Sequence, residues 1–285
     1  MENVRDLRRR IKSVAGTEQM VRAMKMVSVS KFRRTQSELR GAREYLECCR
    51  ELIGCVRAAA PDAVPPLMRE GSGGKPCFVL LTGSRGLCGT YNHDIINFFR
   101  GIAAEEEGEY AIVLCGRWGA DNLDASEFRA DKVFAEISDT PRSGQCGEIT
   151  DYLTEGYLSG RYSRVDIVYQ EFVNTLTQRP ARSVFLPAEG TEAIASKTDC
   201  IFEPDAAAVL DILSEKYVRA YLYTLLLSAK IGEHSARMTA MSAAADNAGE
   251  MKDDLTRILN RARQSAVTTE MLELMGGAVN DGHRP

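Results

Sequence analysis

The stretch YVRAYLYTLLLSAKIGEHSARMTAM, residues 217–241, contains no proline and decides the fold. Its spacing of three and four residues is that of a helical seam. The positions with this spacing are Leu213, Tyr217, Ala220, Thr224, Leu227 and Ile231, and later Met241, Ala244, Ala248, Met251, Leu255, Ile258 and Ala262. We therefore predict one long helix that starts at Glu203-Pro204-Asp205, with Pro204 fixing the first turn, and stops at Gly276-Gly277.

The N-terminal part of the chain carries a matching stripe. Its positions are Val4, Leu7, Ile11 and Val14, and then Leu39, Ala42, Leu46, Cys49, Ile53, Val56 and Ala60. Between these two groups, residues 25–38 are basic and irregular, which we interpret as a seam that either loosens or shifts in phase. Three prolines follow Ala60 and predict the end of this helix.

Two helices with apolar seams at opposite ends of one chain can bury those seams against each other as an antiparallel pair. If both leave the middle of the chain near residues 59 and 205, residue i faces about residue 264 − i. Met24 then lies near Ala240, and Leu7 near Arg257 and Ile258. Residues 265–275 extend beyond the partner helix, and an uncovered apolar surface of this kind usually marks a contact with another protein.

The middle of the chain alternates between apolar runs and helical stretches. The runs are PCFVLLTG (76–83), EYAIVLCG (109–116), VDIVYQEF (165–172) and the weaker RSVFLPA (182–188), with helices expected around 89–105 and 144–158. Strands separated by helices indicate a parallel α/β sheet. The predicted fold is a long antiparallel coiled coil of N- and C-terminal helices plus a small Rossmann-like α/β domain, divided into residues 1–60, 61–204 and 205–285.

Composition excludes several classes of protein. The chain of 285 residues has no apolar run of membrane-spanning length, and its first residues do not resemble a secretory signal. Residues 1–60 hold 14 Lys and Arg against 7 Asp and Glu, yet no nucleic-acid-binding motif accompanies them. The eight cysteines form no C-x-x-C pair and the three histidines are scattered, so we expect free thiols in a reducing cytoplasm and no metal site.

The glycine-rich segment LLTGSRGLCGTYN, residues 80–92, has the layout of a phosphate-binding loop. However, Gly83, Gly86 and Gly89 do not make G-x-G-x-x-G, and no Lys follows them. Cys115-Gly116 ends the second apolar run, where a dinucleotide site would place an acidic residue. We therefore expect a tight strand-to-helix turn, with no nucleotide and no cofactor.

Three segments together resemble the gamma subunit of F-type ATP synthase. They are RRIKSVAGTEQMVRAMKMVSVSKFRR (9–34), SRGLCGTYN (84–92) and the stretch from HSARM to LMGGA (234–278). The family's loop usually reads Ser-Asp-Arg-Gly-Leu-Cys-Gly, and here Gly83-Ser84-Arg85 stands without the Asp. The resemblance implies a non-catalytic rotor shaft inside a hexamer of alpha and beta subunits, which carry out the ATP chemistry.

The resemblance also implies which residues contact partners. It places Met24 and Arg237 near a catalytic beta subunit, and Arg263, Gln264 and Thr268 where relatives hydrogen-bond a beta-subunit loop. The residues themselves leave other interpretations open. Met24 fits ordinary seam packing, Arg237 fits a solvated charge, and the polar run at 263–268 fits a solvated helix face.

The further partners that the resemblance implies are the epsilon subunit and the c-ring, with the protein peripheral to the cytoplasmic face of the bacterial inner membrane. Two other functional classes remain open on the sequence. A nucleotide-dependent enzyme built on the middle domain would bind ATP or NAD through residues 70–205. A free-standing coiled-coil adaptor would be stable without alpha or beta subunits.

Overall fold

The computed structural model describes residues 4–71, 73–123, 128–139, 141, 143–175, 177–189 and 201–281, with the backbone alone at 143 and 273–281. The helices are α1 (Val4–Ala59), α2 (Tyr91–Glu105), α3 (Arg117–Asn122), α4 (Ser143–Leu158), α5 (Ala206–Asp281) and the short 3-10 helix η1 (Pro66–Met68). The strands are β1 (Lys75–Leu81), β2 (Ala111–Cys115), β3 (Lys132–Phe134), β4 (Tyr162–Phe172) and β5 (Gln178–Leu186).

The chain forms two compact units, and each of the two long helices runs through both. One unit comprises residues 1–27 with 240–285, and the other comprises residues 28–239. The predicted fold class, two long terminal helices that pair and a small α/β domain, is confirmed. The three-part division at residues 60 and 204 stays a prediction.

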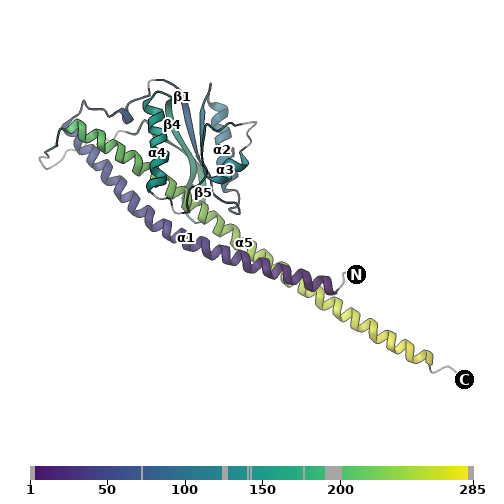
Figure 1. Ribbon diagram of the computed structural model, residues 1–285. Helices are drawn as coiled ribbons and strands as arrows, with labels where there is room; N and C mark the ends of the chain where they lie inside the picture. Colours follow the sequence, from purple (N-terminus) through teal and green to yellow (C-terminus); the bar gives the residue numbers. More distant parts are fainter. Residues whose placement is uncertain are drawn as a thin grey trace. The chain divides into compact units, whose positions relative to one another are not determined.

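The α/β domain of the larger unit is built on a mixed five-stranded sheet of order β3-β2-β1-β4-β5 (Figure 1). β1 pairs in parallel with β2 and β4, and β2 pairs in parallel with β3. β5 pairs with β4 in the antiparallel direction, which corrects the expectation of a wholly parallel sheet. A short turn joins β4 to β5, and such a connection permits only the antiparallel arrangement.

Alternate residues of β1 face opposite layers of the core. Cys77, Val79 and Leu81 are buried in the cluster that also contains α4 and parts of α1 and α5. Phe78 and Leu80 are buried on the other side, in the cluster formed with α2. Because successive strand residues point to opposite faces, a continuous apolar run fits a strand that is covered on both sides.

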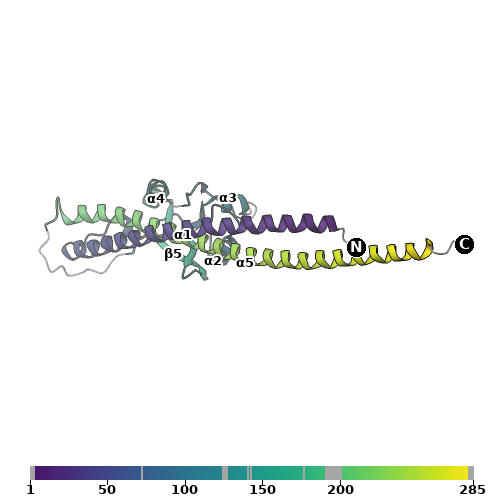
Figure 2. The same cartoon turned by 90° about the horizontal axis from the view of Figure 1, so that it is seen from below.

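Within the same unit, the 28–59 part of α1 and the 206–239 part of α5 lie side by side (Figure 1, Figure 2). Phe32, Leu39 and Ala42 of α1 form a buried cluster with Leu227 and Ile231 of α5. These contacts confirm the predicted pairing of the two seams.

The seam of α1 is continuous, and the predicted shift in phase is wrong. Its buried and half-buried positions alternate in steps of three and four along the whole helix. They are Val4, Leu7, Ile11, Val14, Glu18, Val21, Lys25, Ser28, Phe32, Thr35, Leu39, Ala42, Leu46, Cys49, Ile53 and Val56. The apolar pattern breaks between 18 and 35 because polar side chains occupy seam positions there.

In the smaller unit, two side-chain contacts fix how α1 and α5 pair. Lys25 Nζ donates to Ser242 Oγ at 2.9 Å, and Lys252 Nζ donates to Glu18 Oε2 at 2.7 Å. The predicted register would have placed residues 25 and 18 opposite 239 and 246, so the observed partners lie three and six residues later. The prediction assumed straight helices that leave the middle domain at the same level, whereas long helices usually curve.

The seam of α5 is correspondingly displaced beyond residue 241. It follows Met241, Ala245, Ala248, Lys252, Leu255, Leu259 and Ala262, which are at least half-buried. Met251 and Ile258, which the sequence placed in the seam, are 56% and 46% exposed. Leu7 is fully buried, and its predicted position near Arg257 and Ile258 stays a prediction.

The ends of α5 differ from the prediction in two details. The helix begins at Ala206, and Asp205 Oδ1 accepts a hydrogen bond from Ala208 N at 2.8 Å, so Asp205 is the N-cap and Pro204 precedes the first turn. At the other end the helix continues through Gly276 and Gly277 to Asp281. Glycine lowers helix stability by about 1 kcal/mol per residue but does not by itself end a helix.

Within the described residues, no helix is long and apolar enough to cross a membrane. Seven cysteines are free thiols there, at positions 48, 49, 55, 77, 88, 115 and 146. Cys200 lies outside the described residues.

Candidate functional site

The glycine-rich loop connects β1 to α2, and neighbouring elements of the chain bind its polar groups. Gly83 N donates to Asn92 Oδ1 at 2.7 Å, and Gly83 O accepts a hydrogen bond from Trp118 N at 3.1 Å. A side chain at residue 83 would place its Cβ 3.0 Å from that same Asn92 oxygen, so the close approach requires glycine. The amide that a phosphate site would direct at its ligand is therefore bonded to the start of α2.

Three charged side chains of α5, Lys230, Glu233 and Arg237, form what we call the ionic cluster, and its two cations bind this loop. Glu233 accepts hydrogen bonds from Lys230 Nζ at 2.8 Å and from Arg237 Nη2 at 2.7 Å. Lys230 Nζ also donates to Ser84 Oγ at 2.9 Å. The loop and a helix more than 140 residues later in the chain are thus joined through side chains that the sequence does not place together.

The loop presents carbonyl oxygens to the cluster. Arg237 Nη2 donates to Arg85 O at 3.2 Å, and both its Nε and its Nη2 lie 3.3 Å from Gly86 O. Carbonyl oxygens attract a cation and repel a phosphate, because they carry partial negative charge. This geometry fits a structural turn held by a guanidinium group. The sequence predicted the tight turn but not the role of Arg237 in holding it.

Burial makes the cluster energetically important. Glu233 is 1% exposed, and the side chains of Lys230 and Arg237 are 4% and 11% exposed. Burial opposes the charged form of Glu233, but the positive charges of Lys230 and Arg237 and their hydrogen bonds overcome it and lower its pKa to about 2. The carboxylate is therefore ionised at neutral pH and holds both cations.

A second loop, following β3, reaches the same part of α5. His234 Nε2 lies 3.2 Å from Asp139 O, and the carboxylate of Asp139 pairs with Lys31 of α1. Burial lowers the pKa of His234, so its ring is neutral at pH 7. Ser84 Oγ donates to Ile137 O at 2.9 Å, which connects the two loops to each other.

The structure groups three of the five sequence-predicted contact residues. Arg263, Gln264 and Thr268 share one exposed face of α5 with Asn260 and Val267. Thr268 Oγ1 donates to Gln264 O at 2.9 Å, while the side chains of Arg263 and Gln264 are exposed.

The other two predicted residues lie elsewhere. Met24 lies beside the seam positions Val21 and Lys25 of α1 and is 37% exposed, so packing at the edge of the seam and contact with a partner both stay open. Arg237 belongs to the ionic cluster, so its interpretation as a solvated charge is wrong.

Sequence reasoning missed Lys230 and Glu233. The available signal was their place in LLLSAKIGEHSA, where two charged residues interrupt an otherwise apolar helix within one turn of each other. Charged residues are almost never fully buried without a partner, so such a pair indicates an internal ion pair.

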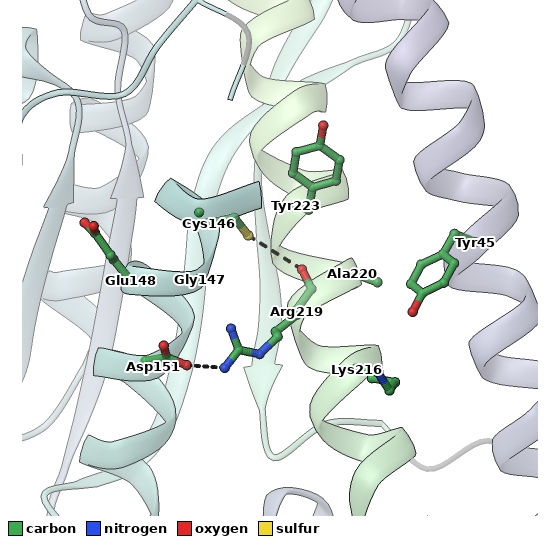
Figure 3. Close-up of a pocket in the computed structure, with 10 residues that line it drawn as sticks. Tyr45, Cys146, Gly147, Glu148, Asp151, Lys216, Arg219, Ala220 and Tyr223 are labelled. Carbon is green, nitrogen blue, oxygen red and sulfur yellow. Dashed lines mark hydrogen bonds and ion pairs between the residues drawn. The ribbon is translucent and has the colours of Figure 1, made fainter. Parts of the chain in front are cut away.

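A separate hollow of about 600 Å³ opens between α1, α4 and α5 (Figure 3). Arg219 is held by the carboxylate of Asp151, and Cys146 Sγ donates to Arg219 O at 3.6 Å. Burial raises the pKa of the Cys146 thiol to about 11, so it is a poor nucleophile at neutral pH. In the part of the chain that the structure describes, no three His, Cys, Asp or Glu side chains form a group that could hold a metal ion.

Comparisons with known proteins cover nearly the whole chain. A family model described as ATP synthase matches residues 3–279. The ATP synthase gamma chain of Pelotomaculum thermopropionicum is 39% identical over 280 residues, covering 98% of this chain and 99% of the relative. The gamma chain of Desulfitobacterium hafniense is also 39% identical, over 278 residues with the same coverage.

Solved structures share the fold. The rotor of the Euglena gracilis mitochondrial ATP synthase matches with a TM-score of 0.64 and 16% identity, over 93% of this chain and 98% of the other. A Euglena gracilis assembly of OSCP, F1 and c-ring contains a chain that matches with a TM-score of 0.67 and 18% identity. The match covers 99% of this chain and 96% of that chain.

Proposed function

Because the chain belongs to the gamma-chain family of ATP synthase, the central-stalk rotor of that enzyme, we propose that it turns inside a hexamer of alternating alpha and beta subunits. Turning couples ion flow through the membrane sector to ATP synthesis or hydrolysis at the beta subunits. The chain itself is non-catalytic. The observation that carries the proposal is the match to gamma chains over 98% of the length of this chain.

The proposed partners are the alpha and beta subunits, the epsilon subunit and the c-ring, with the protein peripheral to the cytoplasmic face of the bacterial inner membrane. Exposed apolar side chains on α1 support a partner surface, because Met20, Met26 and Val27 are 63%, 68% and 54% exposed. The presence of F1 and a c-ring in the Euglena assembly that contains a matching chain also supports it.

We propose that Arg263, Gln264 and Thr268 form one contact with a beta-subunit loop. Their common face on α5 supports this, since the exposed guanidinium and amide can donate to the same acceptor region. Met24 is proposed to contact a beta subunit from α1. For Arg237, the bonds to Arg85 and Gly86 favour a role exerted through the loop that it holds.

The tip of α5 is proposed to be enclosed by other subunits. Val267, Met271 and Leu272 are 53%, 62% and 64% exposed. A row of exposed apolar side chains on a single helix is unfavourable in water. Burial of these side chains against surrounding partner subunits would explain why they are apolar.

Co-expression with alpha and beta subunits tests the proposal. We expect a complex that contains all three chains, with ATP hydrolysis that falls to background when this chain is omitted. Purification of the chain as a stable species that does not associate with alpha or beta would favour an adaptor. Saturable binding of ATP or NAD to the isolated chain would favour the nucleotide-dependent enzyme.

A further inference from the structure

We propose that Glu233 is a positioning residue that locks the α/β domain, residues 75–186, against rotation about α5. The proposal rests on the proposed rotor function, because only a chain that carries torque needs such a lock. It adds to that function a specific internal joint, made by the ionic cluster and the loops that it holds.

The contact between α5 and the α/β domain changes along the helix from mainly apolar packing to mainly hydrogen bonds. Up to Ala229, most buried apolar side chains of α5 join the apolar core that contains the sheet, and a few polar contacts accompany them, such as the bond from Tyr91 OH to Ala229 O. From Lys230 to Thr239, side chains of α5 instead bond to loops of the domain, and their acceptors are mainly backbone carbonyl oxygens. Among the described residues, the interface is therefore mainly apolar up to Ala229 and mainly polar from Lys230 onward.

Three loops meet α5 in the polar region, and we call their contacting carbonyls the collar: Arg85 and Gly86, Asp139, and Thr175. Arg237 donates to the first pair, and His234 contacts the second. Ser235 Oγ donates to Thr175 O at 2.8 Å, and Thr239 Oγ1 donates to the same oxygen at 3.4 Å. Within the collar, Arg85 and Gly86 lie in the loop after β1, and Asp139 lies in the loop after β3. Thr175 lies in the turn between β4 and β5.

Directional bonds resist rotation in a way that apolar packing does not. The hydrophobic effect is non-directional, and interdigitated apolar side chains resist rotation through steric contact alone, whereas hydrogen bonds add a restraint on angle. A hydrogen bond weakens steeply once its angle falls below about 120°, so a small rotation of the helix inside the collar breaks several bonds together.

Glu233 determines the position of the two cations in the collar. Its carboxylate binds Lys230 on one side and Arg237 on the other. Without the charge of Glu233, the buried side chains of Lys230 and Arg237 lack an anion and repel each other. The guanidinium group of Arg237 also loses the carboxylate that orients it toward Arg85 and Gly86. The loop would then be held mainly by the start of α2.

The test compares Glu233→Gln with Glu171→Gln in the complete membrane-bound complex. Glu171 pairs with Arg179 inside the β4–β5 hairpin and makes no ion pair to the described side chains of α5, so it is a control for removing a carboxylate outside the ionic cluster. Two rates are measured in vesicles, ATP hydrolysis and ATP synthesis driven by an imposed ion gradient. Amide exchange at residues 84–86 is measured in the same complexes.

We expect Glu233→Gln to keep ATP hydrolysis within twofold of the parent, to lower ATP synthesis at least threefold, and to speed exchange at residues 84–86. Glu171→Gln should leave all three unchanged. An equal loss of hydrolysis and synthesis would overturn the proposal, because it would mean that Glu233 only supports folding or assembly. Unchanged synthesis with faster exchange would overturn it as well.

Ser84→Ala provides a milder variant if Glu233→Gln does not assemble. It removes the hydroxyl that accepts from Lys230 and leaves the Glu233 ion pairs intact. We expect Ser84→Ala to lower ATP synthesis more than ATP hydrolysis, by a smaller factor than Glu233→Gln does. An unaltered ratio of synthesis to hydrolysis would overturn the proposal. Failure of the rotor function itself would look different, since the parent chain would then give no ATP synthesis.

Discussion

Glu233 gives the protein a specific dependence of stability on pH. Its folded pKa of about 2 lies below the ordinary value of 4.5, so its ion pairs stabilise the fold fully above pH 4.5. That stabilisation is lost as the pH falls from 4.5 toward 2. Replacing Glu233 by Gln should lower the free energy of unfolding by about 3–5 kcal/mol at pH 7, because it leaves two buried cations unpaired.

Urea unfolding of the parent and Glu233→Gln proteins between pH 7 and pH 3 measures this effect. The difference between the two should shrink as the pH falls below 4.5. A difference that stays constant over that range would show that the charge of Glu233 does not hold the cluster.

Arg263 and Gln264 should matter for coupling and hardly at all for folding. Both side chains are exposed, and exposed substitutions usually change stability by less than about 0.5 kcal/mol. A charge-assisted bond to a partner loop contributes about 1.5–3 kcal/mol, so the double change to Ala should lower coupled ATP synthesis severalfold. Unfolding and synthesis are measured on the same double variant, and loss of its helical content would assign the residues a structural role.

The cysteines should differ sharply in reactivity. Cys48 is exposed, whereas burial raises the pKa of Cys115 to about 12 and that of Cys146 to about 11. A maleimide at pH 7 should therefore label Cys48 first in the folded chain, and thiol counting after unfolding without reductant should approach eight. Rapid labelling of Cys115 in the folded state would contradict the packing of β2.

Single residues were the hardest level to predict from the sequence. The glycines at 83, 86 and 89 correctly indicated a tight turn, because glycine permits backbone conformations that tight turns need. The partners of Arg237 could not be predicted, since Arg85 and Gly86 lie about 150 residues away and bind it only through the tertiary fold.

Among the elements, the seam of α1 contains a buried polar position that can be improved. Thr35 is fully buried, and its hydroxyl has no hydrogen-bond partner in the described structure. Thr35→Val keeps the shape and removes the unsatisfied group, so it should raise the free energy of unfolding by about 1 kcal/mol. Thermal unfolding of this variant beside Thr17→Val, an exposed control on the same helix, checks the prediction; a destabilised Thr35→Val would indicate that the hydroxyl is satisfied in solution.

The C-terminal end of α5 should be protected only in the assembly. Residues 265–272 are exposed, and a helical segment of this length without packing frays. Its amides should exchange fast in the isolated chain and at least tenfold more slowly in the complex with alpha and beta. Equal protection in both states would mean that no partner encloses the tip.

Secondary-structure elements were predictable where one pattern extended over many residues. The two long helices followed from spacing, and β1, β2, β4 and β5 followed from apolar runs. β3 was missed because Lys132, Val133 and Phe134 form a very short and largely exposed edge strand without a periodic pattern. The α5 seam was misplaced because Lys252 occupies a position where the neighbouring Met251 is the more apolar residue.

At the scale of the whole molecule, the α/β domain uses its loops to hold its own helix. In open α/β sheets, ligands usually bind beyond the carboxyl ends of the strands. Here the loops after β1 and β3 contact Lys230, His234 and Arg237 of α5 instead. Loops that bind a long helix of the same chain in this way are consistent with a subunit that transmits torque.

The most direct test of the central claim is observation of rotation in single complexes. A probe attached to exposed Cys48 reports the motion of this chain while the alpha–beta hexamer is fixed to a surface. We predict that ATP drives rotation in one direction, in steps that match the three catalytic sites, and that it stops when ATP is removed. ATP hydrolysis at an undiminished rate while the probe only fluctuates about a fixed angle would contradict the account of this chain as a rotor.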